Sequence, residues 1–515
     1  MTLGLTAITV IGIAALLYSA FVPGRWRPWA ILLGSVIALY WLQTPLTPRY
    51  ADFLLPSATV ALGVAGWWLS RPPRRAFLAP AIPSEAPESP SDNSENIAVK
   101  RIYVRDDWFT LLTVVTVILA ISLFRYVGSD FRLTPSRPPS TLFVALTILE
   151  VGLVFTALAL IIRRLPQKTV LSAAIVAMVA LFVVVKWPPA SIAIAGWWRS
   201  LTGQDVTLAA SSDLVWLGFS YAAFRIIHTL RDRQTGILPD LTLRAYLSYI
   251  LFAPSIIAGP IDRAERFTQD YQALGTLKGF DPARWGSGLW RIGEGLFKKF
   301  VIADLLAQGM SLTPALSESS NNSAALWVLL FGYGLRLYFD FGGYSDIAIG
   351  LGQLFGIKLP ENFNRPYVRS NITEFWKSWH ITLSDWARFY VFTPLSRNLL
   401  RRRRPDSPTL LTSTSIVLIG HLATMIVIGL WHGISWNFFI WGLWHGFALF
   451  IHKQWSDRTR KWYRNLQKQK WPKLAWSTAG WAMTITYVML GWVWFLMPTP
   501  AAALQTFSKL FSIGS

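Results

Sequence analysis

The chain has 515 residues, of which 53% are apolar, and it contains no cysteine. The lack of cysteine excludes a disulfide framework, a thiolate metal site and an acyl-enzyme carried on a cysteine. The formal net charge is +21, but the basic residues cluster in short segments between apolar stretches, such as "RPPRR", "IIRRLPQK" and "RNLLRRRR". This distribution is typical of cytoplasmic loops that meet anionic lipid. We therefore expect membrane lipid, and no nucleic acid, among the partners.

Apolar stretches long enough to cross a bilayer recur along the chain. A helix that crosses ~30 Å of hydrocarbon needs about 20 apolar residues. The sequence therefore predicts an all-α, polytopic integral membrane protein with about 11–13 transmembrane or re-entrant helices. The predicted spans lie near residues 4–22, 28–43, 52–69, 108–124, 141–162, 169–186, 213–229, 244–259, 289–309, 323–352, 409–430, 434–451 and 477–497.

The N-terminal part of the chain differs in amino-acid composition from the rest. The first stretch lacks the basic start of a signal peptide, so we expect a retained span whose N-terminus faces outward. The segment "PAIPSEAPESPSDNSENIAVK" has almost no bulky apolar residues and predicts a cytoplasmic Pro/Ser/Glu-rich linker over residues 71–107. N-terminal transmembrane helices would occupy residues 1–70, and further helices residues 108–212.

Residues 371–395, "NITEFWKSWHITLSDWARFYVFTPL", predict an amphipathic helix at the cytoplasmic interface. The spacing of Asn371 and Glu374 is that of a helix cap. Aromatic residues cover one face, and the other face carries Lys377, His380, Ser384 and Arg388. This basic face could bind the phosphates of a nucleotide-linked donor through Lys377 and Arg388, or it could be a stripe that faces lipid headgroups.

Histidines occur in one of the most apolar segments, "GLWHGISWNFFIWGLWHG" at residues 429–446. His432 ends one apolar run, and a second run follows directly. An ionisable group at such depth is costly and by default marks a functional site. Buried histidines are also often structural hydrogen-bond partners, and we assign that role to the remaining ones, His228, His421, His445 and His452.

The motifs that the sequence contains restrict the types of reaction that His432 could catalyse. A neutral imidazole can remove a proton from a hydroxyl near pH 7. The sequence has no G-x-S-x-G elbow and no H-E-x-x-H metal spacing, so we expect no metal cofactor. Direct transfer to a hydroxyl, assisted by one general base, is the simplest remaining catalytic scheme.

Five segments in unbroken order resemble the membrane-bound O-acyltransferase (MBOAT) family, especially its alginate O-acetyltransferase and teichoic acid D-alanyltransferase types. They are "LSYILFAPSIIAGPIDR", "GLFKKFVIADLLA", "LRLYFDFGGYSDIAIGLGQLFGIKLPENFNRPY", "EFWKSWHITLSDWARFYVFTPL" and "GLWHGISWNFFIWGLWHG". The resemblance implies an MBOAT fold with a catalytic core over residues 213–453, followed by a basic loop and a C-terminal helix over residues 454–515.

The resemblance also implies roles for particular residues. The histidine of the W-H-G segment, His432, matches the catalytic one, and His380 matches the second family histidine. Asp340, Tyr344 and Asp346 lie in a segment that resembles a structural and tunnel-lining element. The sequence departs from the family pattern at Phe389, where an aspartate is usual, at Gly342, where a serine is common, and at "PLSRN".

The function implied is transfer of a short acyl group, acetyl rather than amino-acyl, from a cytoplasmic thioester such as acetyl-CoA to a hydroxyl of a cell-surface polysaccharide. An extracytoplasmic acyltransferase-like or esterase-like partner would finish the transfer in a relayed scheme. We expect a multi-pass protein of the bacterial inner membrane. D-alanyl transfer to an envelope polymer is one alternative. A glycan or lipid transporter is another, suggested by the many spans and by Glu150 within one of them.

Overall fold

The computed structural model describes residues 4–72, 92–279, 281–403 and 412–512, with the backbone alone for residues 92–104. Within these residues the regular structure is helical and no strand occurs, which confirms the all-α prediction. Part of the predicted linker, residues 73–91, lies outside the described residues.

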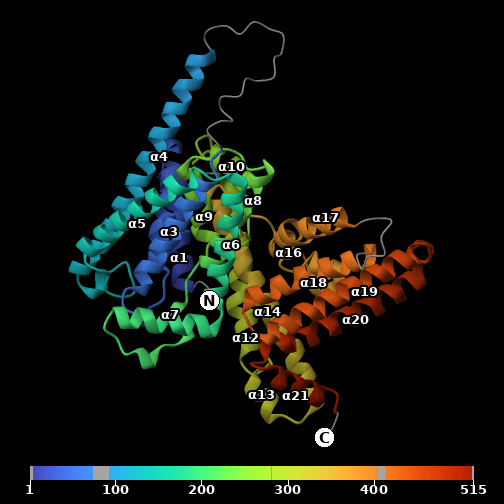
Figure 1. Ribbon diagram of the computed structural model, residues 1–515. Coiled ribbons are helices and arrows are strands. Elements are labelled where there is room, and N and C mark those ends of the chain that lie inside the picture. The colour runs from blue at the N-terminus through green and yellow to red at the C-terminus, as the bar shows by residue number, and fades with distance from the viewer. Residues whose placement is uncertain (1–3, 73–91, 280, 404–411, 513–515) are drawn as a thin grey trace. The chain divides into compact units, whose positions relative to one another are not determined.

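The helices are labelled in Figure 1. Their bounds are α1 (Leu5–Phe21), α2 (Arg27–Trp41), α3 (Ala51–Leu69), α4 (Asp92–Ser122), α5 (Thr141–Ile162), α6 (Gln167–Lys186), α7 (Pro188–Leu201), α8 (Phe219–Thr235), α9 (Leu243–Leu251), α10 (Ala264–Ala273), α11 (Pro282–Leu296), α12 (Asp304–Ala307), α13 (Pro314–Ser319), α14 (Ser323–Phe355), α15 (Ile372–Trp376), α16 (Ile381–Ala387), α17 (Thr393–Arg402), α18 (Ser413–His432), α19 (Trp436–Leu466), α20 (Lys470–Leu496) and α21 (Pro500–Leu510). Two π-helical segments, Phe297–Ala303 and Arg388–Phe392, connect α11 to α12 and α16 to α17.

Seven helices of the described chain are long and apolar enough to cross a membrane, and each overlaps a predicted span. They are α3, α4 from Arg105 onward, α5, α6, α14, α18 and α20. The other predicted spans form helices that are shorter, interrupted or, in α19, extended by a charged second half. These helices establish a multi-pass membrane protein.

The C-terminal part of the predicted linker is helical. Helix α4 begins at Asp92, so residues 92–107 belong to this helix. The segment from Glu95 to Arg105 combines Ala, Lys, Arg and Glu, which favour a helix, with Ile, Val and Tyr, which favour it less, and its polarity is too high for a membrane span. The polar residues therefore extend an apolar helix instead of interrupting it.

The described chain forms two compact units. One unit comprises residues 1–288 and 351–359. In its interior the Arg225 side chain, which is 1% exposed, donates hydrogen bonds to the carbonyls of Tyr249 and Ile250 near the C-terminus of α9. A buried cation in this position satisfies carbonyl groups that have no partner within the helix. Arg225 thus fixes the end of α9 against α8.

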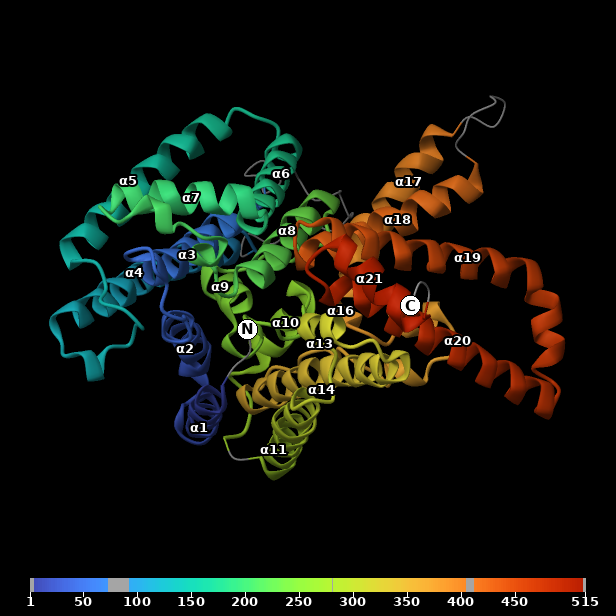
Figure 2. The same cartoon turned by 90° about the horizontal axis from the view of Figure 1, so that it is seen from below.

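The other unit comprises residues 289–350 and 360–515. Its helices α18 and α19 pack against each other, and Figure 2 shows α19 and α20 running antiparallel, joined by the turn at residues 467–469. Glycines allow α18 and α19 to approach backbone to backbone. A Cβ atom at Gly442 would lie 2.7 Å from the Ile426 Cα, and one at Gly446 would lie 3.1 Å from the Leu422 Cα. The spacing Gly442-x-x-x-Gly446 is the small-residue pattern that membrane helices use for close packing.

This packing predicts that Gly442→Ala destabilises the protein, although alanine ordinarily stabilises a helix relative to glycine. The added methyl group would meet backbone atoms of α18, which cannot move aside without separating the helices. We expect a loss of about 1–3 kcal/mol, measured as a lower apparent Tm of the detergent-solubilised protein. The matched control is Gly152→Ala in α5, where a Cβ atom would meet nothing within 4 Å. An unchanged Tm for Gly442→Ala would contradict the close approach.

Candidate active site

His432 is the last residue of α18 and lies where the chain turns into α19. The turn is short, and the Ser435 side chain caps α19 by accepting a hydrogen bond from the Phe438 backbone N–H. The His432 ring is partly exposed and lies among aromatic rings. The distances from its centroid are 4.5 Å to Trp431, 4.7 Å to Phe495, and 5.8 Å to both Phe438 and Trp441. An ionisable side chain is therefore partly exposed while it contacts aromatic rings.

The other histidine of the opening segment lies in a different environment. His445 is 0% exposed, and its Nδ1 atom accepts a hydrogen bond of 3.4 Å from the Trp376 indole N–H. The remaining histidines contact Tyr249 (His228), Phe392 (His421) and Thr373 (His452). His421 and His452 are also partly exposed, so it is the place at the end of a helix that distinguishes His432 from these side chains.

The predicted single amphipathic helix over residues 371–395 is wrong. The chain forms α15, a break, α16 and a π-helical segment instead. The break is at His380, which has left-handed backbone angles of φ 43° and ψ 54°. A non-glycine residue rarely adopts this conformation, and a helix cannot continue through it. The predicted cap is present, since the Asn371 side chain accepts a hydrogen bond from the Glu374 N–H.

The break separates the residues that were expected to share one face. The Lys377 and Arg388 side chains are 64% and 59% exposed and form ion pairs with the nearby Glu374 and Asp385. His380, by contrast, is only 2% exposed. Burial lowers its pKa to about 3, so the ring is neutral at physiological pH. The structure does not bring His380 together with the two cations.

Instead, the structure brings His380 close to His432 through one tryptophan. The ring centroids of His380 and Trp431 are 5.8 Å apart, and those of Trp431 and His432 are 4.5 Å apart. His380 also contacts Phe341 of α14, with the two ring centroids 4.7 Å apart. The two histidines singled out from the sequence therefore belong to one aromatic cluster.

Asn362 holds His380 and the start of α16. Its side-chain oxygen lies 3.1 Å from the His380 Nδ1 atom and accepts hydrogen bonds from the Thr382 hydroxyl at 2.9 Å and the Thr382 N–H at 3.3 Å. Its backbone carbonyl accepts from the Ile381 N–H at 2.9 Å. The Asn362 amide donates to the Ser345 hydroxyl of α14 at 3.2 Å. One 0% exposed residue thus stabilises the unusual backbone at His380.

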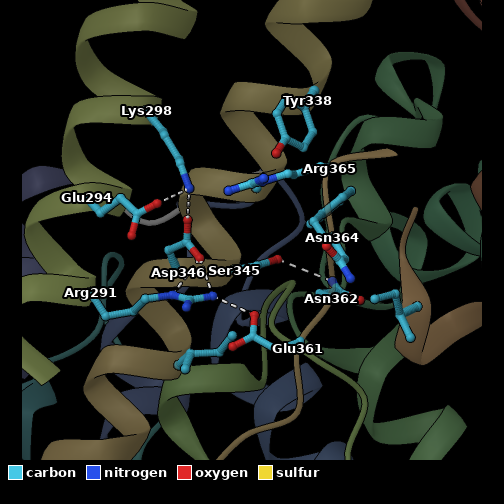
Figure 3. A pocket seen from close by; sticks show the side chains of 14 residues that line it. Arg291, Glu294, Lys298, Tyr338, Ser345, Asp346, Glu361, Asn362, Asn364 and Arg365 are labelled. Carbon is cyan, nitrogen blue, oxygen red and sulfur yellow. Dashed lines mark hydrogen bonds and ion pairs between the residues drawn. The ribbon is translucent and has the colours of Figure 1, made fainter. Parts of the chain in front are cut away.

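A cavity of about 400 Å³ lies beside Asn362 (Figure 3). It is lined by charged and polar residues from α11, its π-helical extension, α14 and the segment after α14. They include Arg291, Glu294, Lys298, Tyr338, Asp346, Glu361, Asn362, Asn364 and Arg365. Three of these side chains are acidic and three are basic. The lining therefore carries no net charge and is not built for a polyanion.

Asp346 is the centre of the ion pairs in this cavity. Its carboxylate is 2.7 Å from both the Arg291 guanidinium and the Lys298 ammonium, and Arg291 also pairs with Glu361 at 2.5 Å (Figure 3). Of the other residues in this α14 motif, Asp340 pairs with Lys299 and Tyr344 is 1% exposed. Gly342, at the position of the usual family serine, lines the cavity, whereas Phe389 is 45% exposed.

Sequence reasoning did not single out Asn362, Arg291, Lys298 or Glu361. All four lie within or beside the segments "GLFKKFVIADLLA" and "LPENFNRPY", whose polar residues interrupt otherwise apolar sequence. Such polar residues indicate a functional site in a membrane protein, but their spacing in the sequence does not show which of them face one another.

Glu150, which suggested a transporter, lies on an exposed part of α5. In the described parts of the chain, no group of three or more potential metal ligands occurs.

Comparisons with known proteins show the family of the chain. The sequence model of the membrane-bound O-acyltransferase family matches residues 172–497, a range that includes both histidines and the cavity. A teichoic acid D-alanyltransferase of Streptococcus thermophilus is 32% identical over 57% of this chain and 72% of its own length. A probable alginate O-acetylase of Azotobacter vinelandii is 34% identical over 58% of this chain and 54% of its own length.

A peptidoglycan O-acetyltransferase of Helicobacter pylori is 34% identical over 52% of this chain and 46% of its own length. The matched region thus spans about half the length of the two O-acetylating relatives. The family match covers more than half of the chain, and it extends over the helices that carry the histidine cluster. The chain belongs to the membrane-bound O-acyltransferase family and is an acyltransferase.

Proposed function

We propose that the protein transfers an acetyl group from a cytoplasmic thioester, acetyl-CoA, to a hydroxyl of a cell-surface polysaccharide. The observation that carries this proposal is the position of His432, a partly exposed imidazole at a helix end among aromatic rings. A general base must reach the hydroxyl proton that it removes, while its surroundings exclude most water. The relatives named for alginate and peptidoglycan O-acetylation support acetyl as the acyl group.

In this reaction His432 takes the proton of the acceptor hydroxyl as the oxygen attacks the thioester carbonyl. The new ester bond forms, the carbon–sulfur bond breaks, and the protonated His432 gives its proton to the leaving thiolate, which restores the neutral imidazole. The imidazole supplies the base without forming a covalent intermediate, because the attacking group belongs to the substrate. His380 assists from the same aromatic cluster.

A relayed reaction is part of the same proposal. An extracytoplasmic partner of the acyltransferase or esterase type would accept the acetyl group first and pass it to the polysaccharide. The hydroxyl that reacts at His432 would then belong to that partner, and the proton transfer at His432 would be unchanged.

D-alanyl transfer is the second candidate. It is favoured by the match to the teichoic acid D-alanyltransferase, which covers 72% of the length of that relative. The same base and the same attack on a thioester would serve this acyl group. The two candidates differ in donor, because an amino-acyl thioester carries an additional ammonium group. Incubation of membranes with labelled acetyl or D-alanyl thioesters would distinguish them.

We expect His432→Ala to lower the rate of acyl transfer at least about 100-fold, the usual contribution of a positioned general base. The measurement is incorporation of labelled acetyl into the polysaccharide or partner by membranes that contain equal amounts of protein. The control is His452→Ala, which removes a half-buried histidine bonded to Thr373 and should keep most of the activity. Full activity of His432→Ala would overturn the proposal.

A separate measurement tests the predicted role of Lys377 and Arg388 in binding the donor phosphates. Both side chains are exposed and can exchange their local ion pairs for phosphate contacts. If they bind donor phosphates, the double variant Lys377→Ala/Arg388→Ala should raise the KM for acetyl-CoA about two- to tenfold and leave kcat unchanged. Lys453→Ala, which removes another exposed cation with an acidic neighbour, is the control. A KM equal to that of the control would show that Lys377 and Arg388 face the lipid headgroups and do not bind the donor.

A further inference from the structure

The hydrogen bonds around Asn362 determine where the His380 ring carries its proton. The Thr382 backbone N–H can only donate, and it points to the same side-chain atom of Asn362 that faces the His380 Nδ1 atom. That atom must therefore be the amide oxygen. If the amide nitrogen lay there, its N–H group and the Thr382 N–H group would be two donors facing each other. The Asn362 nitrogen, at the other end, donates to Ser345.

This orientation fixes the tautomer of His380. An amide oxygen has no proton to give, so the His380 Nδ1 atom must donate across the 3.1 Å contact. In a neutral imidazole the second nitrogen then has no proton and offers a lone pair. The neutral ring of His380 thus carries its acceptor site on Nε2.

The acceptor atom has no use within the described structure. His380 is 2% exposed, and its Nε2 atom has no hydrogen-bond partner among the described residues. A buried acceptor without a partner is costly. The strained backbone at His380 adds to this cost, and such strain is concentrated at functional sites.

We propose that Asn362 is a positioning residue that holds His380 as the Nδ1–H tautomer, so that Nε2 accepts a hydrogen bond from an O–H or N–H group of a bound substrate. The inference rests on the proposed function, because it gives His380 a task beside His432. The shared contact with Trp431 places that task in the same aromatic cluster. Asn362 acts through His380 and does not itself touch the reacting atoms.

The test begins with the tautomer, which needs no substrate. Protein labelled with ¹⁵N-histidine is reconstituted in lipid bilayers, and the His380 signals are identified by comparison with His380→Gln in solid-state NMR spectra. We expect a neutral ring protonated at Nδ1 in the wild type. A ring protonated at Nε2 would overturn the inference, and acyl transfer by the wild type would leave the proposed function intact.

Three variants connect the tautomer to activity. Asn362→Leu removes the acceptor at similar volume and should produce the other tautomer or a mixture, with acyl transfer from acetyl-CoA lowered about 10- to 100-fold. Asn362→Asp keeps an acceptor oxygen and should keep the Nδ1 proton. Thr382→Val is the matched control, since it removes another bond to the same oxygen but leaves the His380 contact. We expect the control to keep the wild-type tautomer.

The outcomes separate this inference from the proposed function. If Asn362→Leu leaves both the spectrum and the transfer rate unchanged, Asn362 has no positioning role. If it changes the spectrum but not the rate, the Nε2 acceptor has no part in the reaction, and the inference also fails. If Asn362→Leu does not fold, the wild-type and Asn362→Asp spectra decide the tautomer. Retained activity of His432→Ala would instead contradict the proposed function and leave the tautomer assignment standing.

Discussion

The close packing of α18 against α19 is the constraint on which the histidine site depends. Gly442 and Gly446 let α19 approach the backbone of α18, so the connection between the two helices can be only a few residues long. His432 ends the first helix, and Trp441 of the second helix contacts its ring. The repeated "GLWHG" sequence therefore has two physical roles. Its first copy carries the partly exposed histidine, and its second copy supplies the glycines that bring the helices together.

The surroundings of His380 depend on a second constraint, the cost of leaving polar groups unpaired away from water. The break before α16 exposes backbone N–H groups, and Asn362 satisfies two of them while also holding the His380 ring. Ser345 connects Asn362 to α14, where the neighbouring Asp346 pairs with Arg291 and Lys298. Charged side chains that line the cavity thus form ion pairs with one another, and they do not make a surface of one sign. Such a network holds its helices in register. The Nε2 atom of His380, next to it, is one of the buried polar atoms that have no hydrogen-bond partner among the described residues.

The sequence was sufficient to predict the helical membrane fold, because length and hydropathy alone identify a span such as α5 or α18. It also singled out His432 correctly as a helix-end residue, since an ionisable group between two apolar runs is conspicuous. It failed at His380, where a 3.6-residue spacing suggested one continuous helix. The left-handed backbone there depends on Asn362, 18 residues earlier, and no local pattern reveals that contact. The partners of Asp346 were missed for the same reason, because Arg291 and Lys298 come from α11 and its π-helical extension, far from α14 in the sequence.

The central claim is that this protein performs acyl transfer at a membrane rather than transport, and one measurement tests it most directly. The purified protein is reconstituted in liposomes with [¹⁴C]acetyl-CoA on one side and the hydroxylated acceptor, a polysaccharide or an extracytoplasmic partner, on the other. The account predicts that label moves onto the acceptor hydroxyl with release of free CoA thiol in equal amount. Movement of the polysaccharide across the bilayer without any consumption of the thioester would contradict it.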